Sequence, residues 1–230
     1  MKRISLLLLF LCVSSLSFAQ YYDATPNRTM HYSQYDSHNK LSGYTVSVNK
    51  SVTESNGVKK VTQDNIVYTV KDGKSKKLDH FPSLWTIDSR NATQTVNMEM
   101  GIKIGKMRMK GPMHIFPHSI TQNTGLNDFS LSMSGKVALI SFDCTMRIYG
   151  RKVVGLERIT VPAGTFDCWK ISEQEDIVAG SVGKAKSGNE KVEQKMSRVL
   201  WIAKNVGVVQ TVNYDKDNKM QSFEKLESIK

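Results

Sequence analysis

Residues 156–172, LERITVPAGTFDCWKIS, constrain the fold of this chain more than any other stretch. Residues 157–161 and 165–171 are rich in β-branched and aromatic side chains, which are typical of β-strands. Between them, Pro162-Ala163-Gly164 supplies turn chemistry, because proline fixes φ at about −65° and glycine tolerates positive φ. The stretch therefore predicts a β-hairpin with Gly164 at a positive φ, around which the other strands pair.

The clearest alternation of apolar and polar residues runs through residues 96–109. Its first apolar face consists of Val96, Met98, Met100, Ile102 and Ile104. At Gly105-Lys106 the phase slips by one residue, and Met107 and Met109 resume the pattern. A one-residue slip within a strand is typical of a β-bulge, and glycine favours bulges. We therefore expect one long strand, bent at Gly105.

Strands are also predicted on both sides of these two stretches. Residues 43–52 and 58–70 flank an Asn56-Gly57 turn, the dipeptide typical of a tight hairpin. Residues 129–133 and 137–149 alternate in the same way, and Gly150-Arg151-Lys152 predicts a turn into the central hairpin.

Three segments do not follow this pattern. Residues 21–40 lack periodicity, which predicts a mobile arm or an irregular lead-in over residues 20–40. Residues 74–90 lose the alternation, and residues 82–85 fit a short helical turn. Residues 179–193 are rich in Gly, Ser and Lys and predict a long exposed loop.

Short strands at regular spacing, without amphipathic helices between them, indicate an all-β fold. We expect a curved antiparallel sheet, either an open barrel or sandwich-like, with long loops and little helix. We also expect residues 20–230, which follow a leader segment, to form a single β-rich domain.

Residues 1–19 are typical of a signal peptide. Lys2 and Arg3 precede a short apolar run, and Ser17-Phe18-Ala19 fits a cleavage site before Gln20. We therefore expect an exported protein of the periplasm or the extracellular face of a Gram-negative-type envelope. Its formal charge would fall from +11 to +9 on cleavage.

Cys144 and Cys168 are the two cysteines that remain after cleavage. In an oxidising compartment such a pair is a disulfide candidate, provided that the Cα atoms come within about 7 Å of each other. The alternative is a pair of buried free thiols that pack as small apolar side chains.

The hairpin and a later strand carry a resemblance to a known family. VPAGTF at residues 161–166, followed by Trp201, Ala203 and the run Val206-Gly207-Val208-Val209, resembles the paired signature of the TapB-like family of exported bacterial envelope proteins. That family is related to a larger uncharacterised domain family. The resemblance implies a curved antiparallel β fold in the cell envelope and implies no catalytic residue.

No motif of metal or nucleophilic chemistry stands out. His114 and His118 are four residues apart, but Pro117 disfavours the helix on which that spacing would suit a metal. On a strand the two would be roughly 13 Å apart, so we interpret them as loop histidines and expect no metal and no cofactor. Nucleophile elbows and phosphate loops are missing from the sequence, and we expect a protein that is not an enzyme.

Positive charge is concentrated in the middle of the chain. Residues 101–152 carry a formal charge of +6, from these eight basic residues against Asp128 and Asp143: Lys103, Lys106, Arg108, Lys110, Lys136, Arg147, Arg151 and Lys152. They either form a solvated sheet face or attract an anionic membrane surface or acidic glycan. Nucleic acid fits poorly, because aromatic residues are not interleaved with the basic ones.

Methionines accumulate in the same segment, where they either fill an ordinary core or form a surface that adapts to variable apolar partners. Two functions therefore stay open: a binding module for a lipid or other apolar or amphiphilic ligand, and a structural or assembly protein of the envelope. The ligand site predicted by the first is formed by Met98, Met100, Ile102, Ile104, Met107, Met109, Ile140, Phe142 and Met146.

Overall fold

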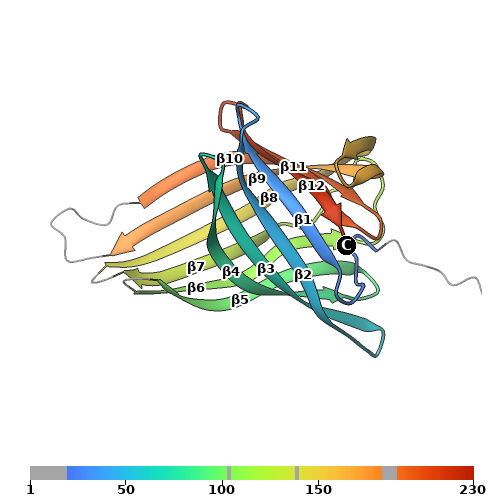
Figure 1. Cartoon of the computed structure of the whole chain (residues 1–230), viewed down its shortest axis with the longest axis horizontal. Helices are drawn as coiled ribbons and strands as arrows, with labels where there is room; N and C mark the ends of the chain where they lie inside the picture. The colour runs from blue at the N-terminus through green and yellow to red at the C-terminus, as the bar shows by residue number, and fades with distance from the viewer. Residues whose placement is uncertain (1–19, 103–104, 138–139, 183–190) are drawn as a thin grey trace, which may run out of the picture.

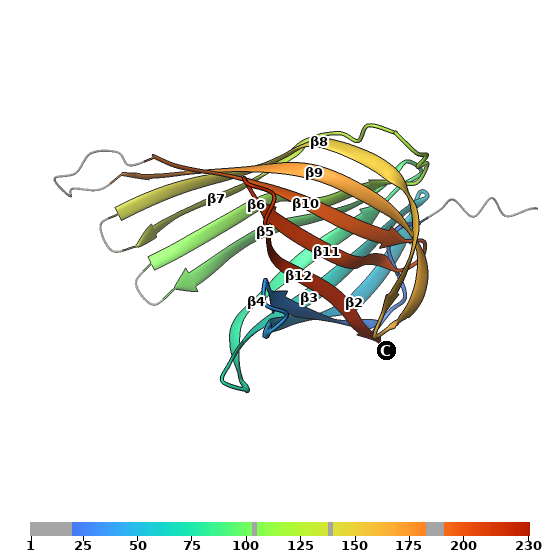
Figure 2. The same cartoon turned by 90° about the horizontal axis from the view of Figure 1, so that it is seen from above.

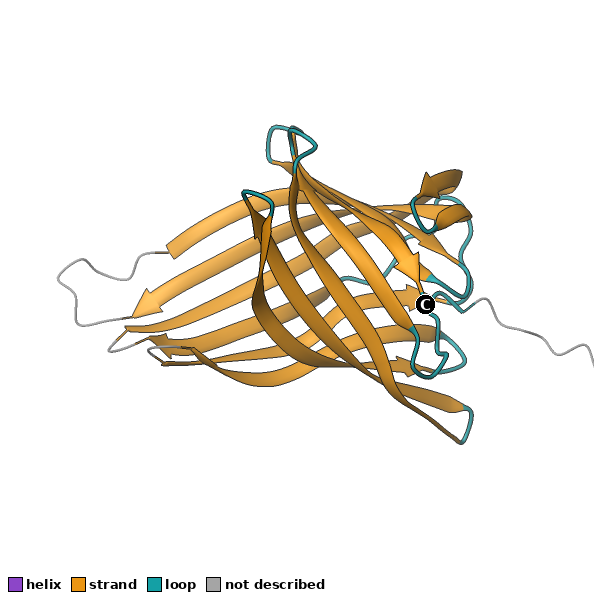
Figure 3. Ribbon diagram, in the orientation of Figure 1, coloured by secondary structure: helices purple, strands orange, loops and turns teal. Residues whose placement is uncertain are grey.

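The computed structural model describes residues 20–102, 105–137, 140–182 and 191–230, so the predicted signal peptide lies outside it. The described residues form strands and no helix, and hence no helix that could span a membrane (Figures 1 and 3). The strands are β1 (Thr29–Asp36), β2 (Leu41–Ser55), β3 (Val58–Lys71), β4 (Lys74–Ile87), β5 (Asn91–Ile102), β6 (Gly105–Pro117), β7 (Phe129–Val137), β8 (Ile140–Val161), β9 (Gly164–Val182), β10 (Lys191–Ala203), β11 (Gly207–Asp215) and β12 (Met220–Ile229).

Each strand pairs antiparallel with its neighbours in sequence, and β1 pairs with β12, so the sheet closes into a barrel. The prediction of an all-β antiparallel fold is confirmed. The central hairpin is also confirmed, since Val161 of β8 pairs with Gly164 of β9. So is the Asn56-Gly57 turn, whose two residues have φ of +50° and +72°, as a tight hairpin turn requires.

The predicted bend at Gly105 is wrong, because the chain reverses there. Met98 pairs with Met109 and Met100 with Met107, so residues 96–109 belong to two antiparallel strands, β5 and β6. Paired residues share a face of the sheet. Because two residues connect the strands, the face that holds even-numbered residues in β5 holds odd-numbered residues in β6. The slip of phase in the sequence therefore marks a hairpin, whose residues 103–104 lie outside the described part.

Other segments also differ from the expectation. Residues 29–36 form β1, which closes the barrel, so this segment is a strand and not a mobile arm. Residues 74–87 form β4 and contain no helical turn. The expected loop at 179–193 is partly strand, because β9 runs to Val182 and β10 begins at Lys191, with residues 183–190 outside the described part.

Gly150-Arg151-Lys152 is not a turn either. The 22 residues of β8 run straight through it, and the register against β9 shifts between Tyr149 and Lys152. Gly150 has a φ of +59°, a left-handed conformation that glycine adopts without steric cost. The segment is therefore a β-bulge, which re-aims the side chain of Arg151.

The barrel flares at the end that carries the hairpins β1–β2, β3–β4, β5–β6, β7–β8, β9–β10 and β11–β12. Strands β4 and β5 pair only from Leu84 to Ile87, and among the described residues Lys74 to Ser83 pair with β3 alone. Similarly, Lys191 to Lys195 of β10 pair with β9 but not with β11. Strands β5 to β10 consequently extend to one side while β3 and β4 turn away from them (Figure 2).

The opposite end of the barrel is packed. Tyr21 and Tyr22, which precede β1, lie in a buried cluster with Ile120 and Leu126 of the segment between β6 and β7. Tyr22 stacks on Trp85 with ring centroids 4.0 Å apart. The interior is therefore closed by side chains at this end and widens towards the flared one.

Candidate functional site

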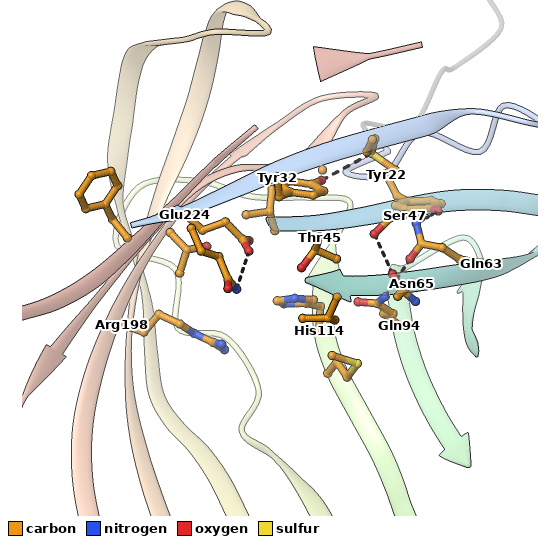
Figure 4. A pocket seen from close by; sticks show the side chains of 18 of the residues that line it. Tyr22, Tyr32, Thr45, Ser47, Gln63, Asn65, Gln94, His114, Arg198 and Glu224 are labelled. Atoms are coloured by element: carbon orange, nitrogen blue, oxygen red, sulfur yellow. Dashed lines mark hydrogen bonds between the residues drawn. The ribbon is translucent and has the colours of Figure 1, made fainter. Parts of the chain in front are cut away.

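A cavity of about 640 Å³ lies inside the barrel, between the packed end and the flared end. Its wall comes mainly from β1 to β4 and β10 to β12, with Gln94 of β5 and Met113 and His114 of β6. This volume is within the range of roughly 300–1,000 Å³ that is usual for small-molecule sites. Figure 4 shows amide and hydroxyl side chains on one side of the cavity and Arg198 and Glu224 on the other.

Gln63 is the centre of a buried network of neutral polar side chains. Its Oε1 accepts hydrogen bonds from Trp85 Nε1 at 3.3 Å, Gln94 Nε2 at 3.0 Å and Ser83 Oγ at 3.3 Å. Its Nε2 donates to the Tyr22 hydroxyl at 2.9 Å. Since each of these groups is buried, the hydrogen bonds offset the cost of removing them from water.

A second part of the same network surrounds Asn65. Ser47 Oγ donates to Asn65 Oδ1 at 2.7 Å, and Asn65 Nδ2 donates to Ser83 Oγ at 3.0 Å. Gln94 Nε2 also donates to Ser83 Oγ, at 3.0 Å, which joins the two parts. The network holds these side chains in fixed orientations along the cavity wall, as a preorganised polar site requires.

The aromatic wall of the cavity continues to a neutral histidine. His114 stacks on Phe116 with centroids 5.3 Å apart, and burial, helped by Arg198 and Arg151, lowers the pKa of His114 to about 3. His114 lies in β6, so its interpretation as a loop residue is wrong; His118 follows the strand. Among the described residues, no cluster of three or more metal-ligating side chains is found.

The charged side of the site is built on Glu173. Its carboxylate accepts from Arg151 Nε at 3.0 Å and from Arg198 Nε at 2.6 Å. Arg151 is 1% exposed and also donates to the carbonyls of Asn127 and Ile115, both at 2.9 Å. One carboxylate therefore serves two guanidinium groups, of which Arg198 reaches the cavity.

Two further carboxyl groups, those of Glu224 and Glu175, interact electrostatically with Arg198. Gln34 Nε2 donates to Glu224 Oε2 at 3.2 Å at the cavity wall, and burial raises the pKa of Glu224. Burial also raises the pKa of Glu175, which lies two residues beyond Glu173 and is 6% exposed. Burial disfavours the charged form of both carboxyl groups, whereas the guanidinium of Arg198 keeps its charge.

The inner face of the flared half is apolar. Gln94 lines the cavity, and Val96 and Met98 follow it on the same face of β5. The register then places one row of side chains across five strands: Met98, Met109, Met133, Cys144 and Ala179. We call Met98, Met107, Met109, Met133 and Met146 the methionine wall.

The predicted ligand residues are distributed over this wall and beyond it. Met98, Met107, Met109, Phe142 and Met146 share the inner face, and all except Met98 are only half-buried although they point into the barrel. None of them belongs to the wall of the 640 Å³ cavity. Met100, Ile102 and Ile140 are strand residues whose side chains lie outside the described part, as does all of Ile104. Their role in binding stays a prediction.

Cys144 and Cys168 are free thiols. Cys144 pairs with Ala179, which lies eleven residues along β9 from Cys168, so the predicted disulfide is not formed. The physical reason is the register, which places the thiols in different parts of the barrel. Burial, followed by Asp167 and Glu157, raises the pKa of Cys168 to about 12.

The basic residues of the central segment do not form one continuous face. Arg151 is buried against Glu173, which contradicts its expected place on a polar outer face. Arg108 pairs with Glu99 at 3.2 Å and Arg147 with Asp128 at 3.4 Å, on the outside of the barrel. Lys103 lies outside the described residues.

The amide network was not found from the sequence. In β2 and β3 the alternation was visible, but the apolar side chains lie outside: Tyr44 stacks on His31 and on Tyr68 at 5.0 and 4.5 Å. A usable signal was present, because Ser47, Asn49, Gln63 and Asn65 are short or neutral polar residues at alternate positions of two strands joined by a tight turn.

Over the described residues, fold and site together define a closed antiparallel barrel of twelve strands that is polar in its depth and apolar at its flared end. A comparison with family models matches residues 27–226 to the DUF3108-like family, and the chain belongs to that family. A comparison with curated proteins found no match.

Two solved structures share this fold. A Bacteroides fragilis protein, provisionally described as exported and as having a YmcC-like fold, has a TM-score of 0.69 at 17% identity, over 92% of this chain and 99% of that one. A Parabacteroides distasonis protein, provisionally described as a lipoprotein, has a TM-score of 0.68 at 19% identity, over the same 92% and 99%.

Proposed function

We propose that this protein is a non-enzymatic binding protein of the cell envelope whose barrel holds a small amphiphilic molecule. The observation that carries the proposal is the division of the interior. A preorganised polar cavity near the packed end continues into an apolar inner face that is not fully covered. Such a pair of surfaces matches a ligand with a polar head and an apolar tail.

The polar head would lie in the 640 Å³ cavity. There the Gln63 and Asn65 networks, Thr45 and Arg198 offer amide, hydroxyl and guanidinium groups. Arg198 already contacts Glu173, so it favours a neutral or weakly anionic head over a cationic one.

The tail would lie along the methionine wall. Half-buried methionines inside a barrel keep accessible apolar area, and covering that area with a tail is favourable by about 25 cal/mol per Å². Methionine adapts its shape, which suits a flexible chain.

Location in the periplasm or on the extracellular face is part of the proposal. It is supported by the signal-peptide pattern of residues 1–19 and by the descriptions of the two solved relatives. The signature at 161–166 and 201–209 further supports a place in the TapB-like group within the family.

The test is titration of the purified protein with a fluorescent single-chain amphiphile, dansylaminoundecanoic acid. We expect saturable binding that a lysophospholipid displaces. Thr45→Trp fills the cavity and should weaken binding about tenfold or more. The matched control is Thr62→Trp, on the exposed outer face of β3, which should bind as the wild type does.

Absence of saturable binding to the wild type contradicts the proposal and favours the structural or assembly role. If Thr45→Trp and Thr62→Trp bind the amphiphile with equal affinity, and both melt close to the wild-type temperature, the head does not lie in the cavity.

A further inference from the structure

Three hairpins at the flared end form a continuous, exposed edge. They are β11–β12, β1–β2 and β3–β4, which are neighbours because β12 pairs with β1 and β2 with β3. We call residues 36–41, 71–80 and 215–220 the rim. Figures 1 and 3 show the three turns on the same side of the barrel.

Large apolar side chains are exposed on the rim. The described residues contain six exposed large apolar side chains, and three of them are Leu41, Leu78 and Met220, which are 37%, 69% and 38% exposed. Leu78 has no partner on β3, because Val67 pairs with Asp79 and Tyr68 with Lys77. It is a bulge residue that presents its side chain to solvent.

Two of the rim hairpins have the same sequence pattern and the same turn. They are Asp36-Ser37-His38-Asn39-Lys40-Leu41 and Asp215-Lys216-Asp217-Asn218-Lys219-Met220. Asp36 Oδ1 accepts from the backbone N–H groups of His38 and Lys40, both at 2.9 Å. Asp215 Oδ1 accepts from Asp217 and Lys219 in the same way, both at 2.9 Å. Each rigid turn therefore presents a lysine followed by an exposed apolar residue.

The rim is also basic. It carries Lys40, Lys71, Lys74, Lys76, Lys77, Lys216 and Lys219 against five aspartates, a formal charge of +2. In the described part of the chain, Lys71, Lys74, Lys76 and Lys77 form no ion pair. Their hairpin, residues 71–80, carries the entire net charge of +2 of the rim.

The rim lies at the mouth of the cavity. Gln34 and Ser42 line the cavity on either side of the β1–β2 turn, and Asn213 and Ser222 do so on either side of the β11–β12 turn. Phe81 of β4 continues this border towards the third hairpin.

We propose that the rim docks the barrel on the surface of an anionic lipid bilayer. Exposed leucine and methionine side chains at turn tips would enter the boundary between head groups and acyl chains, and the lysines would contact anionic head groups. In one respect the proposal rests on the proposed function, because docking would place the mouth where an amphiphile can pass between bilayer and cavity.

The experiment is co-sedimentation of the full mature chain with phosphatidylcholine vesicles prepared with and without phosphatidylglycerol. We expect the protein to sediment with the anionic vesicles, less so at high salt, and little with the neutral ones. The rim variant Leu41→Ser/Leu78→Ser/Met220→Ser should weaken partitioning by about tenfold or more. Its matched control is Leu84→Ser/Val154→Ser/Leu156→Ser, which alters the three exposed apolar residues outside the rim and should leave partitioning unchanged.

Failure of the wild type to sediment with anionic vesicles overturns the proposal, as does an equal loss in both triple variants or equal partitioning into neutral vesicles. Amphiphile binding in solution, measured on the same samples, separates this outcome from failure of the proposed function. The rim variant should retain dansylaminoundecanoic acid binding, because its three residues do not line the cavity.

Discussion

Replacement of Glu173 by glutamine should be among the most destabilising single changes in this barrel. The carboxylate is 2% exposed and is shared by Arg151, 1% exposed, and Arg198, 17% exposed. Glutamine preserves the shape and one acceptor but removes the charge. Removing one partner of a buried ion pair costs about 3–5 kcal/mol, because the remaining charge is left without compensation.

Two features of the structure place the expected loss near the lower end of that range. Arg151 retains its hydrogen bonds to the carbonyls of Asn127 and Ile115, and it lies over the ring of Phe129 at 4.9 Å. Arg198 faces the cavity, where water can solvate it. We therefore expect Glu173→Gln to lower the free energy of unfolding by about 3 kcal/mol, a large share of the roughly 5–15 kcal/mol typical of a folded domain.

The assay is urea denaturation followed by tryptophan fluorescence, with the m-value checked for constancy. Glu175→Gln is the control, because Glu175 lies two residues away in β9, is 6% exposed and has its pKa raised by burial. It should change the free energy of unfolding at neutral pH by less than about 1 kcal/mol or stabilise the protein. If the two variants lose the same stability, or if Glu173→Gln loses less than about 1 kcal/mol, the charge of Glu173 does not hold the two arginines.

Two other predictions concern pH and the central turn. Because the pKa of Glu175 is raised above 4.5 in the folded chain, the contribution of Glu175 to the free energy of unfolding falls as pH rises from 4.5 through the raised pKa. The melting temperature of Glu175→Gln relative to wild type should therefore rise across that window, and a constant difference would contradict the shift. Gly164 has a φ of +141°, so Gly164→Ala should lower the free energy of unfolding by roughly 1 kcal/mol and the melting temperature by about 2–4 °C. The control Gly125→Ala places its methyl group in open space and should leave the melting temperature unchanged. Equal melting temperatures of the two variants would refute backbone strain at Gly164.

Several strands and two tight turns of this barrel could be predicted because their signals are local. Asn56-Gly57 and Pro162-Ala163 are connections whose backbone conformations follow from the residues themselves. The methionine alternation of β5 and β6 is also visible in the sequence, but the slip at Gly105 predicts a bulge. A bulge and a two-residue reversal shift the phase in the same way, and only the pairing of Met98 with Met109 separates them.

The inner side of the barrel could not be predicted, because alternation defines two faces without saying which is buried. A glutamine such as Gln63 is tolerated inside only when its hydrogen-bonding partners are present. Those partners are Trp85 and Gln94, which are 22 and 31 residues away in the sequence. The position of Arg151 was missed for a related reason, since a left-handed glycine before it turns the side chain inward towards Glu173.

The order of the two inner surfaces bears on how a ligand would enter. The polar networks of Gln63 and Asn65 lie near the packed end, where Tyr22 closes the barrel, and the methionine wall lies towards the flared end. An amphiphile bound in this order would insert head first and leave its tail directed at the mouth. A carrier that shields the whole of a long tail from water would need the reverse order, with the apolar surface deepest. On the proposed function, the barrel therefore binds its ligand in solution through the head and the part of the tail on the methionine wall, and docking of the rim on a bilayer would strengthen binding by giving the rest of the tail an apolar phase.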